Sequence, residues 1–227
     1  MLSVILPAYQ ESDNLKFILP ELKEVLNSLG EVYQIIVVDT NVPLDETFKV
    51  CLEHQVEHVK RTPTNSYGDA IRSGISNASG DRILIMDADG SHAPSFIIKL
   101  YDKSSKSSLV IASRYVNGGS SDNPLILQLM SRIVNLTYRF FLGVKCCDVS
   151  NSFRLYDANA LKNLNLRSSD FDIVEEILVK LIRDDSKIVI IEVPYHFNNR
   201  KYGKTKRNLV KFFFSYVSTL IKLKFVY

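Results

Sequence analysis

The stretch Arg82–Pro94, with the sequence RILIMDADGSHAP, decides the fold of this chain. It begins as an apolar run with β-branched residues, the pattern of a strand that is buried on both faces. The run must reach the surface at Asp87, because carboxylates do not continue into a dry core without partners. In an open parallel sheet, ligands bind beyond the carboxyl ends of the strands, where Asp87 and Asp89 can share Mg²⁺ or Mn²⁺ with phosphate oxygens and water. A simple turn before the helix near Pro94 is the alternative interpretation of this pair.

Short apolar strands alternate with amphipathic helices on both sides of this stretch. Besides the strand that begins at Arg82, strands are predicted at residues 2–7, 34–38, 57–61, 109–112 and 188–193. Helices are predicted at residues 12–29, 45–55, 94–104, 125–142 and 171–183, with a further helix ahead of Gly80. Residues 148–156 are expected to form a loop or an edge strand. This alternation predicts an α/β fold with an open, mostly parallel sheet flanked by helices.

The ends of three of these strands carry candidate ligand-binding residues. They are Pro7, Tyr9 and Glu11 at the first, Asp39 at the second, and Asp87 and Asp89 at the strand that begins at Arg82. Each could be a turn residue, but the carboxyl ends of parallel strands meet at one edge, so together they predict a site there. Acidic groups around a divalent ion suit a nucleotide diphosphate. The chain has neither G-x-G-x-x-G after its first strand nor G-x-x-x-x-G-K-[ST], which disfavours a dinucleotide-binding domain and a P-loop NTPase.

A basic stretch follows the last predicted strand. Residues 193–206 read VPYHFNNRKYGKTK, with Arg200 and Lys204 on either side of Gly203. Gly203 permits a tight turn, and the two cations can donate hydrogen bonds to a phosphate. A solvated basic surface loop is the alternative interpretation.

The composition limits the class of protein. A length of 227 residues suits one α/β domain with or without a C-terminal extension. The formal net charge of +3 is too small by itself to indicate nucleic acid, so no nucleic-acid partner is expected. Three cysteines, two of them adjacent, make a poor disulfide framework and a poor zinc site, which favours a reducing, cytosolic location. The N-terminal residues resemble a first strand and not a signal peptide.

Five motifs appear along the chain in a fixed order. They are PAYQE at 7–11, MDADGSHAP at 86–94, ASRY at 112–115, DVSNSFRLY at 148–156 and VPYHFNNRKYGKTK at 193–206. As an ordered set they resemble the family-2 glycosyltransferases, and more narrowly the dolichyl-phosphate mannose synthases with their polyprenyl-phosphate glucosyl relatives. The resemblance runs from about Val4 to about Lys206. It implies a GT-A fold, with a Rossmann-like nucleotide-sugar-binding sheet, and the inverting transfer of one hexose from a donor such as GDP-mannose or UDP-glucose to a polyprenyl phosphate.

The same resemblance implies roles for individual residues. The implied nucleotide contacts are Pro7, Tyr9, Glu11, Asp39 and Asp87. The implied ligands of Mg²⁺ or Mn²⁺ are Asp87, Asp89 and, as a third, Ser91. The implied catalytic groups, which hold the metal, the diphosphate or the acceptor phosphate, are Asp89, Arg114, Arg132, Arg200 and Lys204. Ser131 falls in the same helix as Arg132, whereas Asp148 and Arg154 lie in a matching loop to which the resemblance assigns no fixed role.

Three departures from the family pattern concern the donor side. The family usually has two adjacent aspartates after its second strand, whereas Asp39 is followed by Thr40, and the loop to Asp45 is one residue longer. Gln10 replaces a common asparagine, and Ala112 replaces a common glycine. These changes leave open which nucleotide base the donor carries. They also keep a non-catalytic binding module on the same fold as an alternative.

The choice of acceptor depends on whether a base is needed. A phosphate monoester has a second pKa of about 6 and is largely dianionic at neutral pH, so it needs cations and no general base. A sugar hydroxyl needs a base, and Asp148 or Glu175 would serve if the chain instead builds a surface polysaccharide or glycolipid. The chain has no Trp and hence no Q-x-x-R-W signature of processive synthases, which favours a single transfer. The Arg200–Lys204 motif disfavours a nucleotidylyltransferase.

We expect a glycosyltransferase domain over residues 1–207 and a C-terminal amphipathic helix over residues 208–227. Residues 212–221 are apolar and lie between Lys211 and Lys222, too short a run to span a membrane, which takes about 20 apolar residues. The run fits a helix at the interface with anionic lipid, with packing on the domain as the alternative. Residues 125–142 face the same choice. We expect both helices at the cytosolic face of a membrane, where a membrane-spanning partner subunit could complete the anchor.

Overall fold

The computed structural model describes residues 1–202 and 209–225, with side chains for residues 1–202 and 216–225. The strands are β1 (Leu2–Pro7), β2 (Tyr33–Asp39), β3 (Glu57–Lys60), β4 (Arg82–Ile85), β5 (Leu109–Ser113), β6 (Ser120–Ser121), β7 (Arg154–Asp157), β8 (Ile190–Pro194) and β9 (His196–Phe197). The helices are α1 (Ser12–Ser28), α2 (Thr47–Glu53), α3 (Tyr67–Asn77), α4 (Ile97–Ser104), α5 (Leu125–Leu142), α6 (Ala158–Lys162), α7 (Ile173–Asp184) and α8 (Leu209–Phe225), and a 3₁₀ turn precedes α4 at Pro94–Phe96. The predicted α/β architecture is confirmed.

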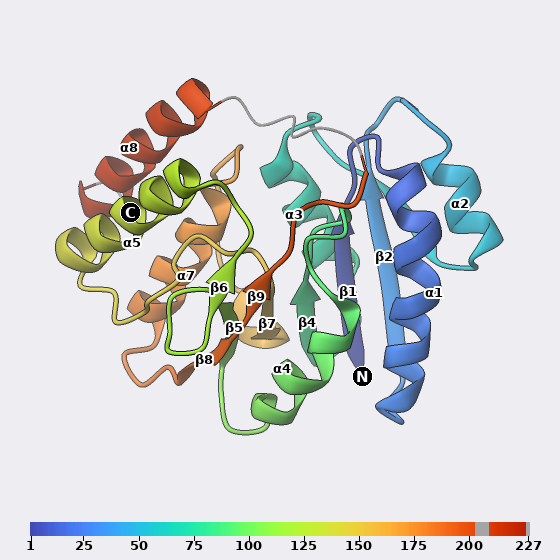
Figure 1. Cartoon of the computed structure of the whole chain (residues 1–227), viewed down its shortest axis with the longest axis horizontal. Helices are drawn as coiled ribbons and strands as arrows, with labels where there is room; N and C mark the ends of the chain where they lie inside the picture. The colour runs from blue at the N-terminus through green and yellow to red at the C-terminus, as the bar shows by residue number, and fades with distance from the viewer. Residues whose placement is uncertain (203–208, 226–227) are drawn as a thin grey trace.

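A seven-stranded sheet organises the chain, with the strand order β3-β2-β1-β4-β7-β5-β8. β1 lies between β2 and β4 and is parallel to both, with Ile5 paired to Ile36 on one side and to Ile85 on the other. All six residues of β1 are buried, as expected for a strand covered on both faces. The parallel strands β1, β2 and β4 therefore end at one edge of the sheet, the upper edge in Figure 1.

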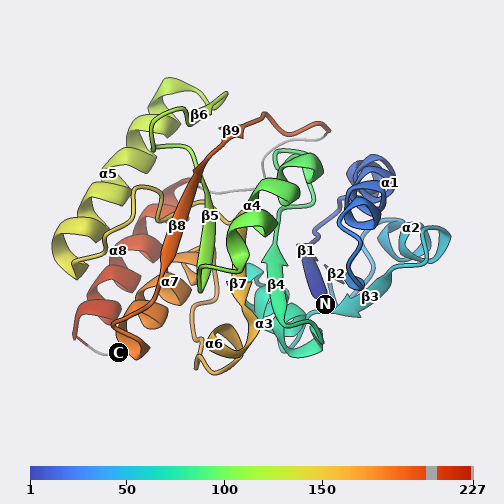
Figure 2. The same ribbon diagram turned by 90° about the horizontal axis from the view of Figure 1, so that it is seen from below.

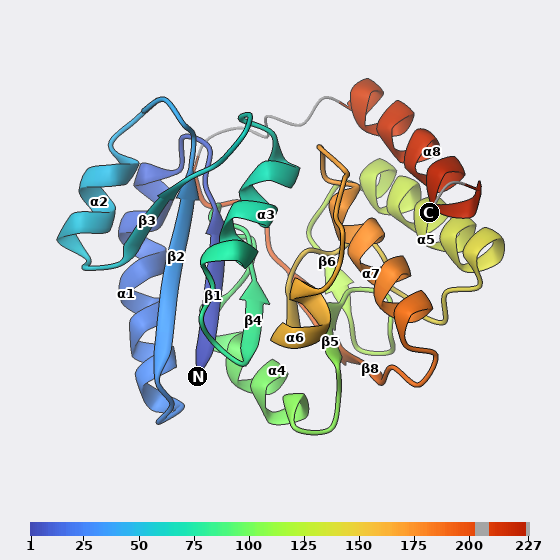
Figure 3. The ribbon, with the colours of Figure 1, turned by 180° about the vertical axis from the view of Figure 1, so that it is seen from behind.

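Helices cover both faces of the sheet (Figure 2). One face packs against α1, α2 and α4, and the core there includes Leu6, Leu19 and Leu84. The other face packs against α3, α6 and α7, which lie in front of the sheet in Figure 3, with α5 and α8 beyond α7. Successive residues of each strand enter opposite cores, because side chains alternate across a strand.

The expectation for residues 148–156 was wrong in one respect. Residues 154–157 form β7, which lies inside the sheet between β4 and β5 and runs antiparallel to both. The first residue of this strand is charged, so the sequence pattern did not indicate that the strand is buried. Arg154 is fully buried, and its guanidinium donates to the backbone carbonyls of Asp148, Val149 and Val174. These carbonyl acceptors allow an arginine to sit in a central strand.

The C-terminal helix α8 packs on the domain through one face. Tyr216 donates a hydrogen bond to the carbonyl of Val134 on α5 at 2.8 Å, and Leu223 is fully buried. Thr219 donates to Asp172, just before α7. The opposite face carries exposed Ile221. Across the described ranges 1–202 and 209–225, every helix is too short or too polar to cross a membrane.

Candidate active site

Asp87 lies just past the end of β4 and is held by two hydroxyl groups. Tyr67, the first residue of α3, donates to Oδ1 at 3.2 Å, and Ser152 donates to Oδ2 at 3.1 Å. Burial raises the pKa of Asp87, although the nearby His92 opposes the shift. Burial also raises the pKa of Tyr67 well above its usual value, so the phenol stays protonated and keeps its donor. Tyr67 carries no motif, and sequence analysis missed it.

His92 fixes the backbone that follows β4. Its Nδ1 accepts the backbone N–H of Asp87 at 2.9 Å, and its ring stacks on Phe153 at a centroid distance of 4.7 Å. Burial lowers the pKa of His92 and keeps the ring neutral. Because Nδ1 is an acceptor, the proton lies on Nε2, which is 3.9 Å from Oδ2 of Asp87. The histidine thus orients the turn that carries both aspartates.

Asp89 and Ser91, two of the expected metal ligands, contact each other directly. The backbone N–H and the hydroxyl of Ser91 both donate to Oδ1 of Asp89, at 3.0 and 2.6 Å. Oδ2 of Asp89 has no hydrogen-bond partner within the described part of the chain. Residues 1–202 and 216–225 hold no group of three or more His, Cys, Asp or Glu side chains able to bind a metal. A cation here would need phosphate oxygens or water to complete its shell, which is the usual arrangement for Mg²⁺.

Residues 195–202, the crossing segment, run over this turn towards α1 (Figure 1). The backbone N–H of Lys201 donates to the carbonyl of Asp89 at 2.9 Å, and Tyr195 donates to the carbonyl of Ser91 at 2.9 Å. Gly90 has a φ of +84°, and a Cβ there would lie 2.9 Å from Cβ of Lys201. Only glycine suits that position, because it combines a left-handed backbone with a close neighbour.

The crossing segment brings two of the predicted residues together. Nη2 of Arg200 donates to both carboxylate oxygens of Glu11, at 2.8 and 2.9 Å. Asn14 is the third member of this group, since its side-chain nitrogen donates to Glu11 at 2.6 Å and its oxygen accepts the N–H of Tyr202. Lys204, the other predicted cation of this motif, lies outside the described residues.

The remaining predicted nucleotide contacts lie at the ends of β1 and β2. Pro7 is buried at the end of β1, whereas Tyr9, two residues later, is 41% exposed. Between Tyr9 and Glu11, Gln10 has a φ of 56°, a backbone region that asparagine tolerates better than glutamine. Asp39 is buried, with Oδ1 accepting the N–H of Thr40 at 2.7 Å and Oδ2 lying 3.2 Å from His58 Nε2.

Arg114 follows β5 and is bound to Asp148. Its Nε and Nη2 donate to the two carboxylate oxygens at 2.8 and 2.7 Å, and its backbone N–H donates to Oδ2 at 2.9 Å. Burial opposes ionisation of Asp148, but the Arg114 guanidinium outweighs it and lowers the pKa of the carboxyl group. Nη2 of Arg114 also donates to the hydroxyl oxygen of Ser150, at 2.9 Å. Asp148, whose role the sequence left open, is the counter-ion of Arg114.

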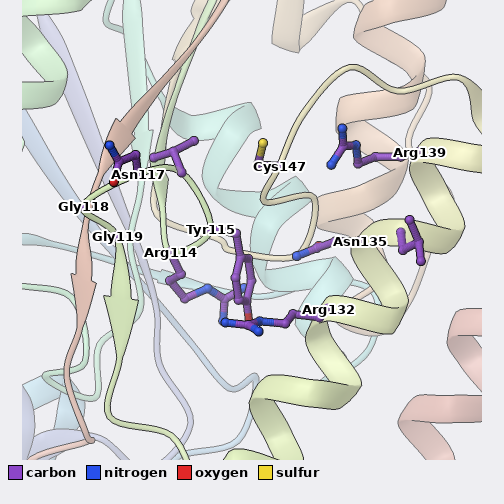
Figure 4. Close-up of a pocket in the computed structure, with 11 residues that line it drawn as sticks. Arg114, Tyr115, Asn117, Gly118, Gly119, Arg132, Asn135, Arg139 and Cys147 are labelled. Carbon is purple, nitrogen blue, oxygen red and sulfur yellow. The ribbon is translucent and has the colours of Figure 1, made fainter.

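A pocket of about 500 Å³ lies between the residues after β5 and one side of α5. Figure 4 shows Arg114 and Arg132 meeting at Tyr115, whose ring centroid lies 5.1 and 5.8 Å from the two guanidinium carbons. Asn135 and Arg139 continue the α5 wall. The structure therefore brings together the predicted Arg114 and Arg132, and it adds Asn135, Leu136 and Arg139 of α5, which carried no motif.

One loop connects this pocket with the aspartates. Residues 148–153 contact Arg114 through Asp148 and Ser150, and contact Asp87 through Ser152. The backbone N–H of Asp148 donates in turn to Glu192 on β8 at 3.0 Å. Arg154, by contrast, lies inside the protein, where it supports the loop through the carbonyls of Asp148 and Val149.

A family model described as glycosyl transferase family 2 matches residues 3–164. The chain belongs to this family. It is 33% identical over 213 residues to a dolichol-phosphate mannosyltransferase of Pyrococcus furiosus, a match that covers 90% of this chain and 58% of that protein. It is 32% identical over 218 residues to a polyprenol monophosphomannose synthase of Mycolicibacterium smegmatis, covering 89% and 79%. The chain thus spans little more than half the length of the first of these relatives.

Solved structures establish the fold of this family member. A glucosyl-3-phosphoglycerate synthase of Mycobacterium tuberculosis, in complex with Mn²⁺, UDP and glucosyl-3-phosphoglycerate, matches with a TM-score of 0.77 and 18% identity, covering 99% of this chain and 80% of that one. The same enzyme with Mg²⁺ and UDP matches with a TM-score of 0.75 and 17% identity, covering 99% and 79%. The expected GT-A fold is confirmed.

Proposed function

We propose that this family-2 glycosyltransferase transfers one hexose from a nucleotide diphosphate sugar to a polyprenyl phosphate. The observation that carries the proposal is that the loop 148–153 contacts both the aspartate turn after β4 and the basic pocket beside α5. The first suits a donor diphosphate, and the second suits an acceptor phosphate. The names of the two relatives support a polyprenyl or dolichyl phosphate as acceptor and mannose as the hexose, with GDP-mannose as the first donor to test.

On the donor side, Asp89 would hold Mg²⁺ or Mn²⁺ through Oδ2, with Ser91 fixing the carboxylate and Asp87 beside it. Bound there, the ion supplies Lewis-acid stabilisation of the leaving diphosphate. The Mn²⁺ and Mg²⁺ complexes of the structural neighbours support this assignment. Pro7, Tyr9, Glu11 and Asp39 surround the same edge of the sheet and are proposed to contact the nucleotide. Arg200 and Lys204 are proposed to bind the phosphates.

On the acceptor side, a phosphate oxygen would attack the anomeric carbon while the bond from that carbon to the diphosphate breaks, with inversion. A phosphate dianion carries no proton that must be removed, so the step needs cations and no base. The two carboxylates considered as bases support this choice. Asp148 is ionised, has a lowered pKa and is engaged by Arg114, and Glu175 is buried in α7. Neither favours a saccharide hydroxyl as acceptor.

We also propose that α5 rests on an anionic membrane surface at the cytosolic face. One side of this helix presents large apolar side chains that are 55–82% exposed, namely Leu125, Ile126, Leu129, Ile133, Leu136 and Phe140. Cationic side chains accompany it, with Arg132 and Arg139 on α5 and Lys224 on α8, which donates to the carbonyl of Phe141. This combination is typical of interfacial helices. A membrane-spanning partner subunit remains a prediction from the family resemblance.

The test of the transfer is radiolabelled sugar from a panel of nucleotide sugars, counted in an organic-extractable lipid with Mg²⁺ or Mn²⁺ present. Label should enter polyprenyl phosphate from one donor and be lost in Asp89→Ala. Metal-dependent donor binding without lipid labelling would refute the acceptor and point to a saccharide. Failure to bind any nucleotide sugar would refute catalysis and favour a binding module.

The test of the membrane surface is flotation with anionic liposomes. Ile133→Asp on α5 should reduce binding, whereas Ile98→Asp, at an exposed position on α4, should leave it unchanged. Equal binding of both variants would refute the surface. Truncation before α8 is a poor test, because it would remove the buried Tyr216 and Leu223 from the core.

A further inference from the structure

Asn135 is a buried amide with an unused donor. It lies on α5, is 4% exposed, and lines the basic pocket. Its Oδ1 accepts the backbone N–H of Val149 at 3.1 Å, which fixes which end of the amide is oxygen. The other end, Nδ2, makes no hydrogen bond within the described chain. A buried donor without an acceptor is destabilising, so its presence in a pocket needs an explanation.

The direction of this donor points to a ligand. Figure 4 shows the nitrogen of Asn135 pointing from α5 towards Tyr115 and the interior of the pocket. Arg132 and Arg139 lie one turn before and one turn after it on the same wall of the helix, and both line the pocket. The donor is therefore placed between two cations, in a space of about 500 Å³ that can admit a phosphate group.

The charge of the pocket indicates which class of ligand it binds. Arg114 is neutralised by Asp148, to which it is paired at 2.7 Å. Arg132 and Arg139 are exposed and form no ion pair with a carboxylate within the described ranges, so both add positive charge to the wall of the pocket. A phosphate monoester is the complement of two cations and one neutral donor, since it is largely dianionic at neutral pH and has oxygens to accept the amide N–H.

We propose that Nδ2 of Asn135 donates to the phosphate of the acceptor, between Arg132 and Arg139, and thereby helps select a phosphorylated lipid over the free alcohol. The inference rests on the proposed function for the identity of the lipid, whereas the phosphate subsite itself rests on the pocket. A site built around a hydrogen bond discriminates strongly against a ligand that leaves its buried donor unpaired.

The test compares binding of farnesyl phosphate, inorganic phosphate and farnesol by calorimetry, without donor, to the full-length protein. Asn135→Asp keeps an oxygen for the N–H of Val149 but replaces the donor by a charge that repels phosphate and pairs with the flanking arginines. It should weaken farnesyl phosphate binding by about tenfold or more, weaken inorganic phosphate similarly, and leave the KM for the donor unchanged. Thr137→Ala, on the same helix outside the pocket, is the matched control.

A second variant covers the case in which Asn135→Asp does not fold. Arg139→Gln changes an exposed side chain, and it should weaken farnesyl phosphate and inorganic phosphate by several-fold while farnesol is unaffected. Unchanged affinity for both phosphates in either folded variant would overturn the inference. Weakening of farnesyl phosphate but not of inorganic phosphate would also overturn it, because the lipid chain would then be the group recognised.

The outcomes separate this inference from the proposed function. If wild-type protein labels the lipid and Asn135→Asp has an unchanged acceptor KM, the subsite is wrong and the transferase assignment stands. If no lipid is labelled by any protein while Asn135→Asp still weakens phosphate binding, the subsite stands and the assigned acceptor is wrong.

Discussion

Replacement of Asp148 by asparagine tests the central ion pair of the site. The carboxylate is fully buried and accepts four N–H groups, three from Arg114 at 2.7–2.9 Å and one from the backbone of Asn151 at 3.2 Å. The amide has almost the same shape as the carboxylate, but an NH₂ group replaces one of the two oxygens. The N–H donors of this group would face the N–H donors of Arg114. The guanidinium would keep its burial, with a side chain 9% exposed, and lose its counter-charge.

The size of the effect follows from that burial. Removal of one partner of a buried ion pair costs about 3–5 kcal/mol, whereas an exposed pair contributes about 0–1 kcal/mol. In a chain of this size the loss corresponds to a fall in Tm of about 10 °C. The pH dependence adds a second signature. The pKa of Asp148 is lower in the folded protein than in the unfolded chain. Its contribution to the free energy of unfolding is therefore present above pH ~4 and is lost as the pH falls towards the folded pKa. The difference between wild type and variant should therefore narrow below pH ~4.

Urea unfolding of wild type and Asp148→Asn at several pH values measures both signatures. The control is Asp122→Asn, because Asp122 is 42% exposed and pairs only with His196 at 3.1 Å among described partners. It should change stability by less than about 1 kcal/mol. A loss below about 1 kcal/mol for Asp148→Asn at pH 7, or a difference that does not change with pH, would show that the pair is not desolvated as the structure indicates.

Three further substitutions test hydrogen bonds made by Tyr67, Asp69 and Glu192. Tyr67→Phe removes a donor to Asp87 and should raise the KM for the donor about fivefold with less than about 1 kcal/mol lost in unfolding, and an unchanged KM would contradict the contact. Burial opposes ionisation of Asp69, but hydrogen bonds from neighbouring side chains hold its pKa at about 2. Asp69→Asn should therefore cost about 2 kcal/mol at pH 7 in chemical unfolding, a difference that disappears as the pH falls from about 4 to about 2. The two carboxylate oxygens of Glu192 accept the backbone N–H groups of Cys147 and Asp148. Glu192→Gln replaces one of these acceptors by a donor, so it should lower the free energy of unfolding by about 1–2 kcal/mol and raise the acceptor KM. An unchanged acceptor KM would argue against this support.

Most of the fold was predictable from the apolar runs and from the Gly and Pro residues that flank them. The prediction of a helix at 125–142 agrees with α5 at both ends, where Pro124 precedes the helix and Gly143 ends it with a φ of +68°. The strands β1, β2 and β4 were predictable because each contains a continuous, buried apolar run, at residues 4–6, 35–38 and 83–85. β7 was not, because a pattern counts Arg154 as a surface residue, and only three-dimensional packing supplies the carbonyls that bury it.

The candidate site also contains both features that the sequence predicts and features that it does not. The aspartates at the ends of β2 and β4 were predictable, since parallel strands bring their carboxyl ends to one edge. The pairing of Glu11 with Arg200 was not, because the two residues are 189 positions apart and meet only after the crossing segment has folded over α1. Asn135 looks like an ordinary polar residue of an amphipathic helix, and its unused donor becomes visible only when the pocket is formed.

The direction of β7 explains why one loop reaches both halves of the site. A strand that ran parallel to β4 and β5 would begin at the opposite edge of the sheet, and the loop before it would lie far from the aspartates. Because β7 is antiparallel, its first residue pairs with the last residue of β4, Ile85, and with Ile111 near the end of β5. The preceding residues 148–153 are therefore delivered to the edge where the parallel strands end, with Asp148 beside Arg114 and Ser152 beside Asp87. The strand that the sequence concealed is thus the one whose orientation joins the donor side to the acceptor side.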